Sequence, residues 1–385
     1  MNIINVNLST IKLEENCILR IPPRKEEDQQ ENYKKLFDYN TLFADIFMIE
    51  DAVELIGPPL LNLEPIFKKA RIFLDGFEFN GKIKIESIHR KCRVTIPTKN
   101  KVSKIKLIYE EYVFNRDVQP NYYEEFRGCN VLVTQSRDNP IEWIIYWIMH
   151  HVVHHKIDSV IIYDNNSSLY TAEELKTQLS KIEELKNLCV INWDIPYGVT
   201  GGDKAIWDSD FGQYQSWEHA YSRLLRKANC VIIDDIDELI LHKDGMAIPD
   251  FLELIDESVV RFKRRQIVEV ASNYGEVYLP RMHCLTHLYE KDKPLWAPKY
   301  AFKPNKIQPD THFLVHDVIG SKTVLSDDIL GRHFGCLRIH WRMENYTPII
   351  MREKNSFKVD LEEDLELLSS FSKIDIDKLR QYLAK

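Results

Sequence analysis

The sequence predicts an α/β fold whose main domain contains a mainly parallel sheet, with a β-rich region before it and a helical tail after it. Two observations carry this prediction. From about residue 130 to residue 235, short apolar segments alternate with segments of helical length. Upstream of residue 118, apolar and polar residues alternate between turn dipeptides. The first pattern is typical of βαβ units, which build parallel sheets, and the second is typical of antiparallel hairpins.

We divide the chain into a β-rich accessory domain at 1–127, an α/β domain at 128–350 and a helical tail at 351–385. Asp75-Gly76 and Asn80-Gly81 are hairpin signals in the accessory domain. The expected α/β elements, in chain order, are strand 131–134, helix 141–155, strand 159–164, helix 171–187 with a Thr cap, strand 189–194, helix 216–228 and strand 230–234. Ligands of such sheets bind beyond the carboxyl ends of the strands, where this chain has polar loops.

Composition narrows the class of protein. The chain has 385 residues and a net charge of -8, which argues against a general nucleic-acid binder. Its seven cysteines are scattered singly, as expected of reduced thiols in a cytoplasmic protein. We see no signal peptide and expect no transmembrane segment, because the apolar window 141–153 is too short to span a bilayer. Peripheral contact with a membrane stays open.

The segment CVIIDDIDELIL, residues 230–241, places four carboxylates in five residues after an apolar strand. Side chains of an extended chain repeat every two residues, so Asp235 and Asp237 can point to the same side while Ile236 faces the core. Hard cations such as Mg²⁺ or Mn²⁺ prefer such oxygen ligands and keep positions open for phosphates. The alternative is an ordinary acidic surface turn. The preceding strand and βαβ pattern favour the metal site.

A second signal is IIYDNNSS, in which Asp164 ends an apolar strand. Its carboxylate could accept hydrogen bonds from a nucleobase or ribose. The competing interpretation is an Asx turn or helix cap, because Asn, Asp and Ser dominate turns.

Four strings in this order, EWIIYW, IIYDNNSS, WDIPYG and QYQSWEHAYSRLLRKANCVIIDDIDEL, resemble glycosyltransferase family 92 and related bacterial sugar transferases of the family 2-like type. KYAFKP (299–304) and RHFGCLRIHWR (332–342) are similar to the family's Lys-containing and His-containing segments. The resemblance covers about residues 129–345. It implies a GT-A fold, a Rossmann-like nucleotide-binding domain whose Asp-x-Asp holds Mn²⁺ (or Mg²⁺) on the diphosphate of a sugar nucleotide.

Carried over by position, the resemblance makes Asp235 and Asp237 the metal motif and Glu238 the acid that follows it. It implies Lys299 and His333 as diphosphate or metal contacts. The residues implied for nucleotide binding are Thr134, Arg137, Asp164, Asn165 and Asp235. The helix before the metal strand matches the family at Gln215 and Ala220. Two features depart from the family: Arg137-Asp138-Asn139 stands where Lys-Asn-Glu is usual, and HHVVHH (150–155) looks like an insertion.

The implied reaction is inverting transfer of a sugar, such as galactose, from a UDP-sugar to a glycan or lipid-linked acceptor in surface or capsular polysaccharide synthesis. An inverting enzyme needs a carboxylate base. Candidates are Glu276 and Asp317, followed by Glu290 and Asp310, and spacing does not choose between them. The alternatives are a nucleotidyltransferase, against which the glycine-free loop TQSRDNP counts, and a non-catalytic carbohydrate-binding protein, against which the intact Asp-x-Asp counts.

The four histidines of HHVVHH form two pairs spaced four apart, so each pair lies on one helical face. Zinc binding would need a further ligand at the right step, and the HExxH pattern is absent. We therefore expect a surface or packing role for these histidines.

Overall fold

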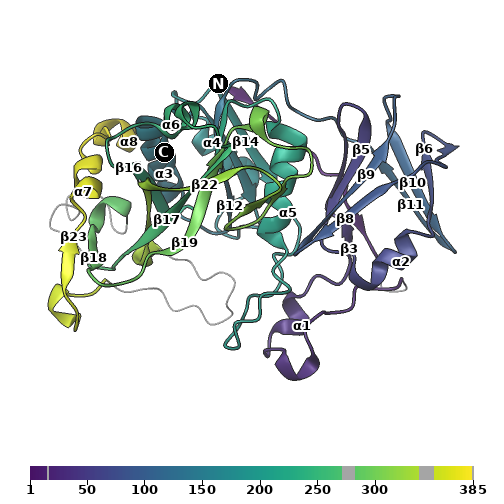
Figure 1. Ribbon diagram of the computed structural model, residues 1–385, viewed down its shortest axis with the longest axis horizontal. Helices are drawn as coiled ribbons and strands as arrows, with labels where there is room; N and C mark the ends of the chain where they lie inside the picture. Colours follow the sequence, from purple (N-terminus) through teal and green to yellow (C-terminus); the bar gives the residue numbers. More distant parts are fainter. Residues whose placement is uncertain (15–16, 271–281, 338–350, 384–385) are drawn as a thin grey trace.

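The computed structural model describes residues 1–14, 17–270, 282–337 and 351–383. A nine-stranded sheet with helices on both faces forms its larger part, and two four-stranded sheets lie beside it (Figure 1). The predicted α/β character of the main domain is confirmed.

In spatial order the strands of the large sheet are β1 (Asn2–Ile3), β14 (Asn187–Asn192), β13 (Ser159–Asp164), β12 (Asn130–Ser136), β15 (Cys230–Ile233), β19 (Trp296–Phe302), β17 (Val259–Ile267), β22 (Thr323–Phe334) and β16 (Glu238–His242). From β1 to β15 all neighbours run parallel. Beyond β15 the sheet is mixed, since only β17 and β22 run parallel there. The predicted mainly parallel sheet is thus a mixed one. The short link of four residues after β15 leads to β16 at the far edge of the sheet, where β16 pairs antiparallel with β22.

Helices cover the sheet on both faces. On one face α3 (Ile141–His155), α4 (Ala172–Leu179) and α6 (Ile248–Leu254) bury their apolar side chains. On the other face lies α5 (Gly212–His219), which continues as a π-helix over Ala220–Leu225. Helix α4 ends earlier than predicted, but it begins at the predicted Thr cap, which forms a capping box with Glu174. Helix α5 begins four residues earlier than predicted.

The accessory region contains two antiparallel sheets around a separate apolar core. Their strands, in spatial order, are β4 (Asp45–Met48), β5 (Ala52–Gly57), β9 (Lys91–Pro97) and β8 (Lys84–Ile88), and then β11 (Tyr112–Asp117), β10 (Lys104–Tyr109), β6 (Arg71–Leu74) and β7 (Phe77–Glu78). Smaller elements are β2 (Ile11–Lys12), β3 (Thr41–Phe43), α1 (Tyr33–Leu36) and α2 (Glu64–Phe67).

Of the two predicted hairpin turns, Asp75-Gly76 is confirmed: both residues have positive φ, and the turn joins β6 to its partner β7. The Asn80-Gly81 prediction is wrong, because β7 and the following β8 belong to different sheets. A turn dipeptide reverses the chain locally but cannot determine which strand the next segment will pair with.

The two ends of the chain both join the α/β domain. Residues Asn2–Ile3 pair with β14 at the edge of the large sheet. In the tail, β23 (Leu361–Glu363) pairs with β18 (Leu288–Glu290), and α7 (Leu365–Phe371) and α8 (Ile376–Leu383) bury residues in the core beside α3. A short hairpin, β20 (His312–Phe313) and β21 (Val318–Ile319), follows β19. Within the residues described, no helix combines the length and apolar character needed to cross a membrane.

Candidate functional site

The carboxyl ends of the parallel strands bring the predicted polar loops to one edge of the sheet. Ser136 at the end of β12 is in register with Asp164 at the end of β13, and Asp164 is in register with Asn192 at the end of β14. On the other side of β12, Val133 is in register with Ile233, the last residue of β15. The acidic turn therefore begins at the same edge as the loop of Asp164.

The acidic turn, Asp234 to Asp237, alternates between buried and partly exposed side chains. Asp234 and Ile236 are buried, whereas Asp235 and Asp237 are partly exposed, as the two-residue period predicts. The ring of His283, buried beneath the turn, is hydrogen-bonded through Nε2 to the carbonyl oxygen of Ile236 at 2.7 Å. His283 thus holds the backbone of the turn from the buried side, and the carboxylates of Asp235 and Asp237 lie on the partly exposed side.

Asp235 is held by two side chains from different elements. Its Oδ1 accepts a hydrogen bond from Nε2 of Gln213 at 3.1 Å, and its Oδ2 accepts one from Nζ of Lys299 at 2.7 Å. Lys299 is fully buried on β19, and Gln213 lies in the first turn of α5, where its Oε1 accepts a hydrogen bond from Tyr197. A buried ammonium beside the turn supplies positive charge to an otherwise acidic site.

Asp237, Glu238 and His333 form a possible cation-binding group. One ligand atom from each lies within 4.8 Å of the others. Glu238 and His333 face each other across β16 and β22, and Nε2 of His333 lies 3.3 Å from Oδ2 of Asp237. Glu238 accepts a hydrogen bond from Arg264 through Oε1, and it is also hydrogen-bonded to the side chain of Asp234. The two carboxylates suit Mn²⁺ or Mg²⁺, and the imidazole favours Mn²⁺, because Mg²⁺ prefers oxygen ligands.

Asp234 is fully buried behind this group. Burial, together with the neighbouring carboxylate of Glu238, raises the pKa of Asp234 well above its usual value. Its Oδ2 lies 3.4 Å from Nε2 of His151 on α3. The raised pKa favours the neutral form of Asp234 and so reduces the negative charge buried at this point.

A groove of about 570 Å³ opens beside Asp164, between the ends of β13 and β14, helix α4 and residues 5–7. The carboxylate of Asp164 accepts a hydrogen bond from Oγ of Ser167 at 2.5 Å, and burial raises its pKa. The Asx-turn interpretation of this residue therefore describes its local bonding, and the buried Asp164 also forms part of the groove wall.

The other residues predicted for nucleotide binding lie in different surroundings. Thr134 is fully buried within β12. The buried amide of Asn165 donates to the carbonyl oxygens of Trp193 and Ile195. Arg137 is partly exposed, with Nε 3.7 Å from Oδ2 of Asp138. Of the residues predicted to bind the nucleotide, Asp164 lines the groove and Asp235 lies in the partly exposed acidic turn.

The predicted bases are dispersed, and their pairings do not single one out. Asp317 is paired with Arg261 at 3.2 Å on the partly exposed side of β17. Glu290 pairs with Lys293, and Asp310 with Lys84 of the accessory region. Glu276 lies outside the described residues.

The four histidines of HHVVHH (150–155) lie on α3. They are buried or nearly so, and their rings are hydrogen-bonded to backbone atoms. Nε2 of His150 and Nε2 of His155 both lie within 2.9 Å of the carbonyl oxygen of Ile240, and Nδ1 of His151 lies 2.8 Å from the carbonyl oxygen of Trp147. The two contacts to Ile240 anchor α3 on β16, whereas the contact of His151 lies within α3.

Sequence reasoning did not find Gln213 or Arg264, which hold Asp235 and Glu238. Gln213 lies in the string that carries the family resemblance, but no spacing rule connects it to the acidic turn. Arg264 lies in an alternating basic strand, KRRQ, which resembles an ordinary solvated face. A β-bulge between Phe262 and Arg264 reorients this strand, and the local sequence does not predict this bulge.

No protein-family model and no curated protein matches the chain. Among solved structures it is similar to TarS of S. aureus. A crystal structure of TarS 1–349 matches at 11% identity and a TM-score of 0.30, covering 52% of this chain and 60% of that one. The complex of the same fragment with UDP-GlcNAc matches at 10% identity and a TM-score of 0.33, covering 57% and 62%. The chain thus spans about three fifths of the TarS fragment, so what it does has to be inferred from its own residues.

Proposed function

We propose that this protein is a metal-dependent glycosyltransferase that uses a nucleoside-diphosphate sugar. The observation that carries the proposal is the acidic turn at the carboxyl edge of the parallel strands, where Asp235 and Asp237 meet Glu238, His333 and the buried Lys299. The nearby groove at Asp164 supports it, because a nucleoside and a metal-bound diphosphate must be held side by side.

The residues present fit a divalent cation. Asp237, Glu238 and His333 would hold Mn²⁺ or Mg²⁺. The two carboxylates and the imidazole each offer a ligand atom within 4.8 Å of the others, and such a donor set can hold a divalent cation. The other predicted ligand, Asp235, lies beside them and is hydrogen-bonded to Gln213 and Lys299. When bound, the metal supplies positive charge that stabilises the departing nucleoside diphosphate.

The chain's own side chains have separate tasks in this scheme. Lys299 adds a second positive charge close to the leaving group, and because it is buried its charge is poorly screened. Gln213 and Lys299 orient Asp235 toward the ligand side of the turn. Asp164 would accept hydrogen bonds from the nucleoside in the groove. The base that deprotonates the acceptor hydroxyl is not assigned.

The finer parts of the proposal rest on the family resemblance. They are membership of family 92, a UDP-sugar donor such as UDP-galactose, inversion, a glycan or lipid-linked acceptor of a surface polysaccharide, and a cytoplasmic location with peripheral membrane contact. Each of them goes beyond what the site residues carry.

The test is hydrolysis of a panel of UDP-, GDP- and CMP-sugars with Mn²⁺, with Mg²⁺ and with chelator, for the wild type and for Asp237→Asn. We expect slow, metal-dependent hydrolysis of one donor, which Asp237→Asn abolishes. The matched control is Asp377→Asn, an exposed aspartate that pairs with Arg380 in the tail. It should behave as the wild type.

A thermal-shift measurement with each nucleotide and metal accompanies the panel, because donor hydrolysis can require an acceptor. Stabilisation by a nucleoside diphosphate only in the presence of metal supports the proposal even without turnover. Turnover of nucleoside triphosphate and sugar phosphate would instead identify a nucleotidyltransferase. If neither metal nor any nucleotide stabilises the protein, the acidic turn is structural and the proposal is wrong.

A further inference from the structure

Helix α5 lies between the acidic turn and the accessory region. Figure 1 shows it at the side of the large sheet that faces β5, β9 and β8. Several side chains of α5 and its π-helical continuation contact the accessory strands. Gln213, in the first turn of α5, contacts Asp235 of the acidic turn. The same helix therefore touches both the accessory region and the candidate site.

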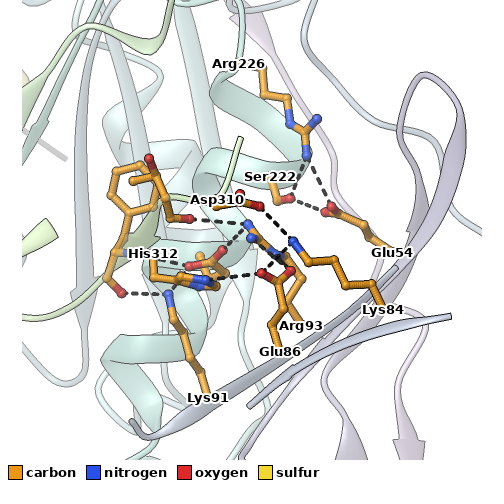
Figure 2. A network of polar contacts seen from close by, with 12 residues as sticks. Glu54, Lys84, Glu86, Lys91, Arg93, Ser222, Arg226, Asp310 and His312 are labelled. Carbon is orange, nitrogen blue, oxygen red and sulfur yellow. Dashed lines mark hydrogen bonds and ion pairs between the residues drawn. The ribbon is translucent and has the colours of Figure 1, made fainter. Parts of the chain in front are cut away.

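The strongest contact between α5 and the accessory region is a buried cluster of charges (Figure 2). Glu218 accepts hydrogen bonds from Nζ of Lys91 and from Nη1 of Arg93, the latter at 2.8 Å. Arg93 also pairs with Glu86 at 3.1 Å. The side chains of Glu218, Lys91 and Arg93 are almost completely buried. Since opposite charges balance within the cluster, it can bind the helix to β9 without leaving a charge unpaired.

A second buried chain runs from the nucleotide side of the sheet to the accessory region through His219. Tyr163, which precedes Asp164 on β13, has its hydroxyl 2.7 Å from Nδ1 of His219. Nε2 of His219 lies 2.8 Å from Oδ2 of Asp45 on β4, and Arg223 donates to the same oxygen. The carboxyl-terminal end of α5 is thus fixed against β4 of the accessory region and against β13.

The contact nearest to the site comes from Arg90, in the short turn between β8 and β9. Its guanidinium donates to Oδ1 of Asp210 at 2.5 Å, also donates to the hydroxyl of Tyr214, and lies 4.1 Å from the centre of the Tyr214 ring. Asp210 precedes α5, and Tyr214 belongs to its first turn. Arg90 therefore holds the start of α5 from both sides of Gln213, the residue that donates to Asp235.

We propose that the N-terminal β region is a positioning element of the catalytic site. Arg90 is a positioning residue: it fixes the first turn of α5 so that Gln213 holds Asp235 in the orientation that the site requires. This inference rests on the proposed function for its catalytic consequence, and on the contacts alone for its structural one. A shift of about 1 Å in a positioned group can lower a reaction rate by up to about a hundredfold, so a loose first turn should be detectable.

The kinetic test is a double-mutant cycle on metal-dependent donor hydrolysis. Arg90→Ala and Gln213→Ala should each lower kcat by about tenfold. The double variant should be no slower than Gln213→Ala, because Arg90 acts through Gln213. Arg90→Lys, which keeps the charge but not the stacked planar group, should recover only part of the rate.

The matched control is Lys84→Ala. Lys84 lies on the adjacent strand β8 and pairs across the same interface with Asp310, but its side chain is 54% exposed. We expect its kcat and KM to equal those of the wild type. Equal rates for Arg90→Ala and wild type, or additive losses in the double variant, would overturn the positioning role.

A second measurement does not depend on any activity. Hydrogen–deuterium exchange of the peptide covering residues 230–242 reports on the acidic turn, whose Glu238 amide is hydrogen-bonded to the carbonyl oxygen of Asp235. Arg90→Ala and Gln213→Ala should speed its exchange, and Lys84→Ala should not. If Arg90→Ala leaves this exchange unchanged, the inference fails even though the transferase proposal stands. If Arg90→Ala speeds this exchange but the protein has no donor activity, the positioning inference stands and the transferase proposal fails.

Discussion

Replacing Glu218 with glutamine removes one negative charge from between two buried cations and almost preserves the shape of the side chain. Glu218 is fully buried on α5 and accepts hydrogen bonds from Lys91 and Arg93 of β9. Its Oε2 also accepts a hydrogen bond from the backbone N–H of Phe313 at 3.3 Å. The Glu218→Gln variant therefore tests what this charge cluster contributes to the stability of the folded protein.

The expected cost is large because the remaining cations have no water to replace the lost carboxylate. Breaking a buried ion pair by removing one partner typically destabilises a protein by about 3–5 kcal/mol. Burial, together with Arg93, already lowers the pKa of Lys91 well below its ordinary value in the wild type, which reduces the cost of losing its proton. Arg93 keeps Glu86 as a partner. We therefore expect a loss near the lower end, about 3 kcal/mol.

The matched control is Glu124→Gln. Glu124 also bridges two cations, Arg127 at 2.7 Å and Lys227 at 2.5 Å, but its side chain is 61% exposed. Exposed pairs contribute about 0–1 kcal/mol. Urea unfolding followed by circular dichroism at pH 7 gives both free energies of unfolding. Equal losses in the two variants would refute the argument that burial makes the Glu218 cluster costly to break.

A companion variant checks the cause of the loss. Glu218→Gln combined with Lys91→Met removes the negative charge and one of the two cations that faced it. Because Arg93 remains paired with Glu86, the double variant should regain part of the stability that the single variant loses. A double variant less stable than Glu218→Gln would show that packing, and not unbalanced charge, dominates.

Three further outcomes are expected of the same unfolding assay. Gly198→Ala should cost about 1–3 kcal/mol more than Gly76→Ala, because both glycines have φ near +90° but only at Gly198 would a Cβ meet backbone, at 2.0 Å. Thr171→Ala should cost about 1 kcal/mol by removing the capping box of α4. Stability should fall as the pH drops below about 6.5, the unfolded histidine pKa, because burial lowers the pKa of His155 to about 3 and of His283 to about 4. Only the unfolded state then gains protons, so the free energy of unfolding should fall by about 1.4 kcal/mol per pH unit for each histidine. A free energy of unfolding that stays constant between about pH 7 and 5.5 would contradict this.

The residue pattern alone was enough to predict the parallel half of the sheet. The apolar segments that became β12, β13, β14 and β15 are each followed by polar loops, and helices of the expected type connect most of them. These features are local: side-chain period, cap residues and segment length are properties of neighbouring positions in the chain. For the same reason the two-residue period predicted that Asp235 and Asp237 would be exposed beside a buried Ile236.

Tertiary structure decided what lies opposite those residues. Lys299, Arg264 and His333 reach the acidic turn from strands that follow it by some 25 to 95 residues, through antiparallel pairings that no turn dipeptide encodes. Gln213 meets Asp235 because α5 is held at a particular position by the accessory strands. Such contacts depend on how separate elements pack, which is a sum over many weak interactions distributed along the chain. The sequence thus determined the chemistry at the edge of the sheet, and only the packing of distant segments determined which side chains complete it.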